Sequence, residues 1–108
     1  MTSEEESQVN QSILDRVEAL GGGYVRDAEV FAVNLMGVAL DDDEARPLCG
    51  LLSIQQIALD ASQLSYGTIN ALPRIGGLQS LVLGRRALSD SQRSELGRLG
   101  PSVIEVDA

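Results

Sequence analysis

Hydrophobic residues return along this chain with a period of 24 positions. Ile57 and Leu59 alternate with small or polar residues, and Leu81 and Leu83 repeat the arrangement one period later. Such alternation predicts a strand with one buried face. A repeat of this length is typical of a solenoid, in which each unit buries its apolar side only by stacking on its neighbours. The residues in phase are Val30, Val33, Leu35, Leu40, Ala45, Leu48 and Leu51, then Ile54, Ile57, Leu59, Leu64, Ile69, Leu72 and Ile75, then Leu78, Leu81, Leu83, Leu88, Leu96 and Leu99.

A polar turn and a helix start follow each predicted strand. Asp41, Ser65 and Ser89 keep the same period, and all three are good N-cap residues. Glu44 and Gln92 stand three positions after the first and the last of them, which predicts reciprocal capping boxes. Strand and helix therefore alternate, so the strands should be parallel. Since packed helices need about 8–10 Å and paired strands only about 4.8 Å, the layers should curve with the sheet on the inner face.

The residues before the repeats predict a cap. Residues 9–20 have apolar positions at helical spacing, and a helix there can cover the open end of the first layer. Residues 24–26 predict a short strand that forms a hairpin with the chain after residue 28. We therefore expect a disordered acidic tail over 1–8, a cap helix and hairpin strand over 9–29, and three repeats plus a terminal strand over 30–108.

The stretch VNLMGVALDD at residues 33–42 resembles the strand-and-turn segment of bacterial leucine-rich repeat proteins with short repeats of about 24 residues. The preceding helix, the glycines at 21–23 and the hairpin resemble the lead-in often found before such repeats. The resemblance implies an α/β fold, a short right-handed leucine-rich-repeat-like solenoid with a parallel sheet on the inner face, helices on the outer face and an N-terminal capping helix. It also implies a surface for binding other macromolecules, with no catalytic residue to carry over. Where many members keep a turn asparagine, this chain has Val38, Ser62 and Arg86, so its turns must satisfy their amides differently.

The charge and the cysteine content limit the classes of binding partner and the cellular compartment that we expect. Sixteen acidic residues against eight basic ones give a net charge of −8, which disfavours nucleic acid and anionic membranes as partners. The single cysteine, Cys49, excludes an internal disulfide and fits a reducing compartment. No apolar run approaches the length of a membrane span, and the first residues do not form a secretory signal. We expect a cytoplasmic protein.

Candidate chemistry is sparse. The acidic run at 41–44 suggests either a divalent metal site or acidic residues at a helix N-terminus, and the phase of Asp41 with the other N-caps favours the helix. The glycines at 21–23 follow a helix, whereas a phosphate-binding loop precedes one. The chain has no histidine to serve as a base beside a serine or Cys49. We therefore predict no catalytic residue, no cofactor and no metal.

A partner is expected on the inner face of the sheet and on the loops beside it. The Arg85-Arg86 doublet could clamp an anionic ligand, but the favoured interpretation is a pair that is either solvated or bridges to a neighbour such as Asp60, diagonally across on the preceding strand. Four strands span only about 15 Å, so other surfaces would have to contribute to an interface of about 800 Å² per partner. The candidate partner-binding residues are Asn34, Met36, Gln56, Asp60, Val82, Arg85, Arg86 and Glu105.

These patterns predict a non-catalytic protein–protein interaction module whose protein partner the sequence does not identify. The terminal strand is an uncovered edge, which predicts a homodimer across a two-fold axis. Two alternatives are a compact α/β regulatory domain of the STAS-like type and a self-associating structural domain; an enzyme is a remote third. Strand order separates the first alternative from the solenoid, because only the solenoid keeps sequential strands as neighbours.

Overall fold

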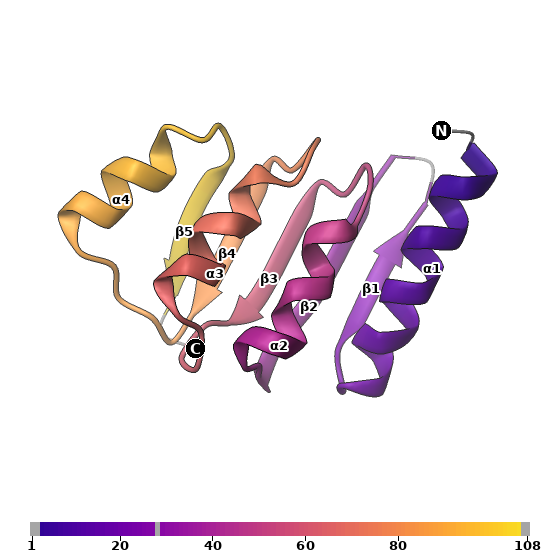
Figure 1. The fold of residues 1–108 in the computed structure, drawn as a ribbon, viewed down its shortest axis with the longest axis horizontal. Helices are drawn as coiled ribbons and strands as arrows, with labels where there is room; N and C mark the ends of the chain where they lie inside the picture. Colours follow the sequence, from indigo (N-terminus) through magenta and orange to yellow (C-terminus); the bar gives the residue numbers. More distant parts are fainter. Residues whose placement is uncertain (1–2, 28, 107–108) are drawn as a thin grey trace.

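The computed structural model describes residues 3–27 and 29–106, which form an α/β fold around one five-stranded sheet (Figure 1). The strands are β1 (Gly23–Arg26), β2 (Phe31–Ala39), β3 (Gln56–Asp60), β4 (Ser80–Gly84) and β5 (Ser102–Val106). Their order in the sheet is their order in the chain. Strand β1 runs antiparallel to β2, and all the other neighbours are parallel. The reordered sheet that the compact regulatory alternative requires is therefore not formed.

The helices lie side by side along the sheet in the order in which they occur in the chain (Figure 1). The helical segments are α1 (Ser3–Ala19), α2 (Asp42–Ala45) with the 3-10 helix η1 (Arg46–Gly50), α3 (Tyr66–Ala71) with η2 (Leu72–Arg74), and α4 (Asp90–Gly97). Helix α1 begins well before the expected start at Val9. The prediction of a disordered tail is therefore wrong for residues 3–8, while Met1 and Thr2 lie outside the described residues. Glutamate is a good helix former and negative charge is favoured at a helix N-terminus, so an acidic run can extend a helix instead of preventing it.

The periodic N-caps are confirmed at all three sites. The side chains of Asp41, Ser65 and Ser89 each accept the backbone N–H three residues on. The capping box is reciprocal in α2 and α4, because Glu44 and Gln92 accept the N-cap amide in return.

The middle helix is capped differently because Thr68 offers no long side chain to reach back to the N-cap amide. The Ser65 N–H instead donates to Oδ1 of Asp42, one layer earlier, at 2.8 Å. The acidic run at 41–44 thus caps two consecutive helices, and Asp43 pairs with Arg46 at 2.6 Å.

The predicted hairpin is confirmed. In the β1–β2 ladder Tyr24 lies opposite Val33 and Arg26 lies opposite Phe31. The Asp27 carboxylate accepts the N–H groups of Glu29 and Val30, which closes the turn. These two bonds hold the pKa of Asp27 below its usual value. The antiparallel strand β1 therefore covers the edge of the parallel sheet that β2 would otherwise expose.

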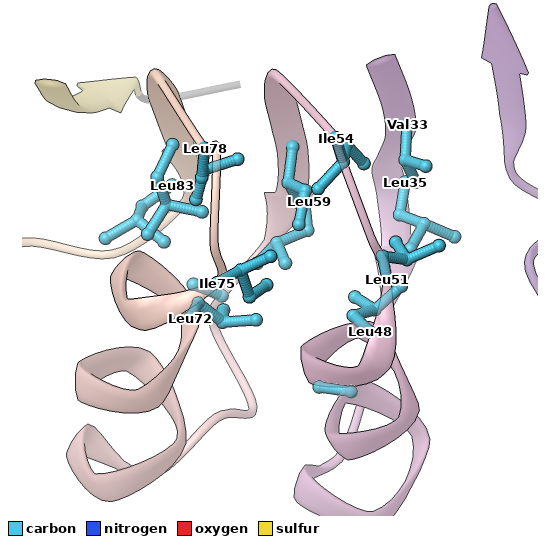
Figure 2. Packing of buried hydrophobic residues seen from close by; sticks show 14 of the residues in the cluster. Val33, Leu35, Leu48, Leu51, Ile54, Leu59, Leu72, Ile75, Leu78 and Leu83 are labelled. Atoms are coloured by element: carbon cyan, nitrogen blue, oxygen red, sulfur yellow. The ribbon is translucent and has the colours of Figure 1, made fainter. Parts of the chain in front are cut away.

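The core lies between the sheet and the helices and is built from aliphatic rungs in register. Leu35, Leu59 and Leu83 are opposite one another on β2, β3 and β4 and are fully buried. Figure 2 shows them pointing toward Leu48 and Leu72 of the helical segments. Strands β3 and β4 pair at an offset of 24 residues, as in Gln56 opposite Ser80, and Ile57 and Leu81 are both buried. The 24-residue pattern thus identifies the buried face of the middle strands correctly.

The last strand departs from that period. Ser80 lies opposite Ser102, which is 22 residues away, so the final layer is two residues shorter than the others. In the sequence, Val103, Val106 and Ala108 match Leu78, Leu81 and Leu83 with a shift of one residue from the 24-residue period, which predicts that Val106 lies opposite Leu81. The structure has Val103 there, three residues earlier, and a shift by an odd number of residues exchanges the two faces of the strand. Val103 and Glu105 therefore lie in register with the core residues Leu81 and Leu83. The predicted end of this strand, Asp107 and Ala108, lies outside the described residues.

A buried asparagine attaches α1 to the first layer. The Asn10 side chain is 1% exposed. Its Oδ1 accepts the N–H of Leu52 at 2.8 Å, and its Nδ2 donates to the Leu52 carbonyl at 2.9 Å. Leu14 and Val17 of the same helix enter the common core. The helix is thus held by apolar contact and by the pairing of both backbone groups of one loop residue.

Candidate functional site: the open face of the sheet

In the part of the chain that the structure describes, one face of the sheet carries no helix, and we call it the open face. Alternate strand positions point to the core, so the remaining positions define this face. The core cluster contains the core-facing strand residues together with residues of all the α-helices. The open face consists of Val25, Ala32, Asn34, Gln56, Ala58, Ser80, Val82, Ser102 and Ile104.

The middle of the open face is a row that becomes aliphatic toward β5. Asn34, Ala58, Val82 and Ile104 are opposite one another on four successive strands. Ile104 is 45% exposed, and none of the three apolar members belongs to the core cluster. The row on one side holds the polar residues Gln56, Ser80 and Ser102 in register. An exposed aliphatic stripe beside polar residues is typical of a contact surface for another macromolecule.

A shallow hollow lies at the β1 end of this face. It has a volume of about 390 Å³ and is lined by Val25, Ala32, Asn34, Gln56 and Ala58, among others. Val25 is 56% exposed there. The hollow and the aliphatic row share Asn34 and Ala58, so they form one continuous surface.

Three of the predicted partner-binding residues lie on the open face as expected. Asn34 and Gln56 are exposed, and Val82 is half-buried in the central row. The Asn34 side chain also accepts the N–H of Met36 at 2.9 Å. Met36 was predicted to continue this face, but β2 leaves its register with β3 between Leu35 and Ala39. A bulge of this kind turns the strand away, so Met36 does not extend the row.

Asp60 was also predicted to present its carboxylate to a partner, and that prediction is wrong. It occupies an open-face register position, yet it is only 1% exposed. Its Oδ1 accepts both the N–H and the hydroxyl of Ser62, at 2.9 and 2.6 Å. Arg85 lies at 3.8 Å from Oδ2, which confirms the predicted pairing. Asp60 thus supplies the hydrogen-bond acceptor for the turn after β3.

Asp60 should contribute to the acid sensitivity of the fold. The Ser62 hydroxyl, the Ser62 N–H and Arg85 hold the pKa of the Asp60 carboxyl below its usual value. A depressed folded-state pKa stabilises the protein above the unfolded value of about 4, and this contribution disappears as the pH falls through the folded value. Asp60→Asn, which keeps the acceptor oxygen, should therefore reduce the loss of unfolding free energy between neutral and acidic pH in urea titrations.

A second variant checks the cause of that effect. Ser62→Ala removes the hydroxyl donor and leaves the charge of Asp60 in place. It should give a pH dependence intermediate between the wild type and Asp60→Asn. An unchanged pH dependence in Asp60→Asn would contradict the assignment of acid sensitivity to this turn.

The two arginines of the doublet have different roles. Arg85 is exposed and adopts φ +58° at the end of β4. Arg86 is half-buried, and its guanidinium donates to the carbonyls of Leu64 and Ala61. It therefore satisfies the preceding turn, and the prediction that it contacts a partner is not supported by its position. Arg85 is the member of the doublet that remains at the surface.

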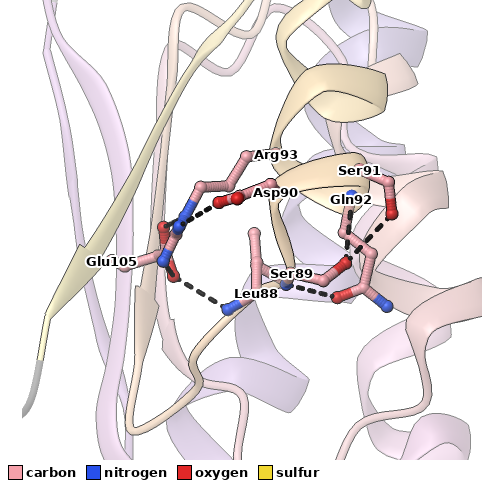
Figure 3. A network of polar contacts seen from close by, with 7 residues as sticks. All are labelled: Leu88, Ser89, Asp90, Ser91, Gln92, Arg93 and Glu105. Carbon is pink, nitrogen blue, oxygen red and sulfur yellow. Dashed lines mark hydrogen bonds and ion pairs between the residues drawn. The ribbon is translucent and has the colours of Figure 1, made fainter.

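Glu105 lies on the core side of β5, so its predicted position on the open face is wrong. Figure 3 shows its carboxylate between α4 and the segment before it. Oε1 accepts the Leu88 N–H at 2.9 Å, and Oε2 accepts from Arg93 Nε at 2.6 Å. The hydrogen bond from Arg93 is the largest cause that holds the pKa of Glu105 below its usual value, and the bond from the Leu88 N–H adds to it. The residue connects β5 to α4 instead of facing a partner.

Sequence reasoning missed the two most exposed apolar residues of the open face, Val25 and Ile104. The pattern in residues 24–26 predicts a short strand, but it does not indicate which side chains of that strand face the core, so the exposure of Val25 was missed. Ile104 was missed because of the register error in the last strand.

Groups with chemical reactivity are sparse in the part of the chain that the structure describes. Cys49 is exposed in η1, and partial burial of its sulfur raises the pKa of its thiol. Within residues 3–27 and 29–106 no cluster of carboxylates and thiols is placed to hold a metal ion. None of the described helices has both the length and the apolar character needed to cross a membrane.

Comparison of the chain with protein-family models, with curated proteins and with solved structures finds no match. The open face is therefore interpreted from its own geometry and charge.

Proposed function

We propose that this chain is a non-catalytic protein–protein interaction module that uses the open face of its sheet. The observation that carries the proposal is the aliphatic row of Ala58, Val82 and Ile104, which lies in register on three strands and changes from buried at Ala58 to 45% exposed at Ile104. Val82 and Ile104 lie outside the core cluster and have no structural need to be apolar, because solvent-facing strand positions tolerate polar residues.

We further propose that the architecture is a short right-handed solenoid of the leucine-rich-repeat type. Sequential strand order, parallel pairing at a 24-residue offset and recurring N-caps support it. The antiparallel β1 and helix α1 would act as the N-terminal cap. In such an arc the open face is the inner surface, and the wider spacing of helices than of strands keeps it accessible.

The chemistry of the surface favours a partner segment with aliphatic side chains next to basic ones. Val82 and Ile104 offer aliphatic contact, and the hollow beside Val25 can accept another small apolar side chain. The net charge of −8 arises within residues 1–50, because residues 51–108 contain five acidic and five basic residues. A basic segment would therefore be attracted to the N-terminal half of the chain.

The chemistry of the chain's residues favours binding over catalysis. The chain has no histidine, and the raised pKa of Cys49 disfavours its thiolate form at neutral pH. Arg85 is exposed and lies beside the buried carboxylate of Asp60. The bonds from Ser62 to Asp60 close the turn after β3, and Asp60 is only 1% exposed, so this pair favours a structural role over catalysis.

Selection from a displayed library of random peptides on the immobilised chain tests the proposal. We expect the selected peptides to be enriched in lysine or arginine and in branched aliphatic residues. Val82→Lys should lower their binding at least about tenfold, because it removes the centre of the row and repels basic segments.

Ser94→Lys is the matched control, since it makes the same change of charge on the exposed surface of α4. Binding should persist in this control and should weaken as salt is added. Peptides that bind Val82→Lys as well as the wild type, or a selection without enrichment, would overturn the proposal.

A further inference from the structure

The outer edge of β5 carries main-chain groups that the described sheet leaves without a strand partner. Ser102 donates its N–H to Gln79, and the Val106 carbonyl accepts the N–H of Arg85, both at 2.9 Å. In a parallel ladder alternate residues bond to one neighbour. Ser102, Ile104 and Val106 thus face β4, and Val103 and Glu105 direct their N–H and C=O groups away from it.

This edge is complementary to itself. If two β5 strands lie antiparallel about a two-fold axis through Ile104, Val103 of each copy is opposite Glu105 of the other. Both residues then exchange N–H and C=O bonds, which satisfies four donors and four acceptors in the pair. Ile104, 45% exposed, lies opposite its own copy on the open face.

Other symmetric registers are poorer. Centring the pair on Val103 places Glu105 opposite Pro101, which has no N–H to donate. Centring it on Glu105 places two carboxylates directly opposite each other, which is destabilising. The residues of this strand therefore select the register centred on Ile104.

The surroundings of the edge suit a second copy. Residues 51–108 have balanced charge, so two C-terminal halves do not repel each other as two N-terminal halves would. A hollow of about 340 Å³ lies along the edge, lined by Arg93, Gly97, Pro101 and Val103, among others. Gly97, which lines this hollow, has open space where a side chain would stand, so it leaves room beside the edge for a second copy.

We infer that the chain forms a two-fold homodimer through antiparallel β5–β5 pairing centred on Ile104, which joins two five-stranded sheets into one. The ladder is short, so the dimer dissociates on dilution. The inference concerns the edge of the sheet and does not depend on partner binding to the open face.

Disulfide trapping tests the register directly. Opposite residues without mutual hydrogen bonds have Cα atoms about 4.5 Å apart, which is within the range of a disulfide. In a Cys49→Ser background, Ile104→Cys should cross-link into dimers with oxidised glutathione. Ser102→Cys alone should not, because its opposite residue is Val106 of the other copy. A mixture of Ser102→Cys and Val106→Cys chains should cross-link.

Sedimentation analysis across a concentration series provides the second readout. The wild-type mass should rise from 11.5 kDa toward twice that value. Ile104→Lys and Ile104→Glu should each remain monomeric, and their equimolar mixture should dimerise again because opposite charges then meet on the axis. Val25→Lys, at a position on the opposite edge strand that is 56% exposed, should dimerise like the wild type.

Circular dichroism melting of each variant shows whether it folds, and the mixture restores dimers only if both chains are folded. A wild-type mass that stays at 11.5 kDa at all concentrations overturns the inference. Cross-linking of Ser102→Cys alone as efficient as that of Ile104→Cys also overturns it. The peptide selection with Val82→Lys is unaffected by either result, so failure of the dimer and failure of the proposed function can be told apart.

Discussion

Replacing Leu59 by alanine should lower the free energy of unfolding by about 3 kcal/mol. Leu59 is fully buried at the centre of the rung formed with Leu35 and Leu83 (Figure 2). Truncation removes the transfer free energy of the side chain and leaves a cavity that two rigid neighbouring strands cannot fill. Urea unfolding monitored by circular dichroism measures the change.

Val82→Ala is the matched control, because Val82 lies one strand away but points to the open face. It should cost less than about 1 kcal/mol, as expected for a site outside the core. Equal losses from Leu59→Ala and Val82→Ala would contradict the assignment of one buried and one open face. The comparison therefore tests the two-faced character of the sheet as well as the size of the core.

Replacing Asn10 by alanine should lower the free energy of unfolding by about 2–3 kcal/mol. The substitution leaves both the N–H and the C=O of Leu52 without the partners they have at 2.8 and 2.9 Å. The cost of such unpaired groups exceeds the net gain of an ordinary hydrogen bond. Helix α1 should also lose protection in amide hydrogen exchange, because its polar attachment to the first layer is gone.

Gln11→Ala provides the control for Asn10→Ala. Gln11 is exposed and bonds only within α1, to Asp15 at 2.8 Å. Its removal should change stability by no more than about 0.5 kcal/mol. Loss of exchange protection in α1 with Gln11→Ala, or none with Asn10→Ala, would show that apolar contact alone attaches the helix.

The middle layers could be predicted in detail because their information is local. Alternation across Ile57–Leu59 and Leu81–Leu83 identifies the buried face of each strand, and Ser89 with Gln92 forms the predicted capping box. The alternation depends on neighbouring positions of one strand, and the capping box depends on two residues within one helical turn. The 24-residue repeat then places equivalent residues side by side, because stacking in register is the way that each layer can bury its apolar side.

The candidate site was predicted only in part, because it depends on the register of the last strand and on the paths of long side chains. Glu105 and Ile104 exchanged faces when the final layer proved two residues shorter than the others. Arg86 turned inward to two carbonyls, a choice that depends on acceptors 22 and 25 residues away. Asp60 holds the expected register position but is covered by the turn that it stabilises.

The sequence by itself determined the elements, the chain-order sheet and the aliphatic rungs, since periodicity and capping are properties of neighbouring residues. The tertiary structure alone decided what Asn10 does, where the last strand lies and which residues remain exposed. The physical reason is distance along the chain: Asn10 and Leu52 are 42 residues apart, and no local pattern specifies which backbone groups a buried amide will pair with.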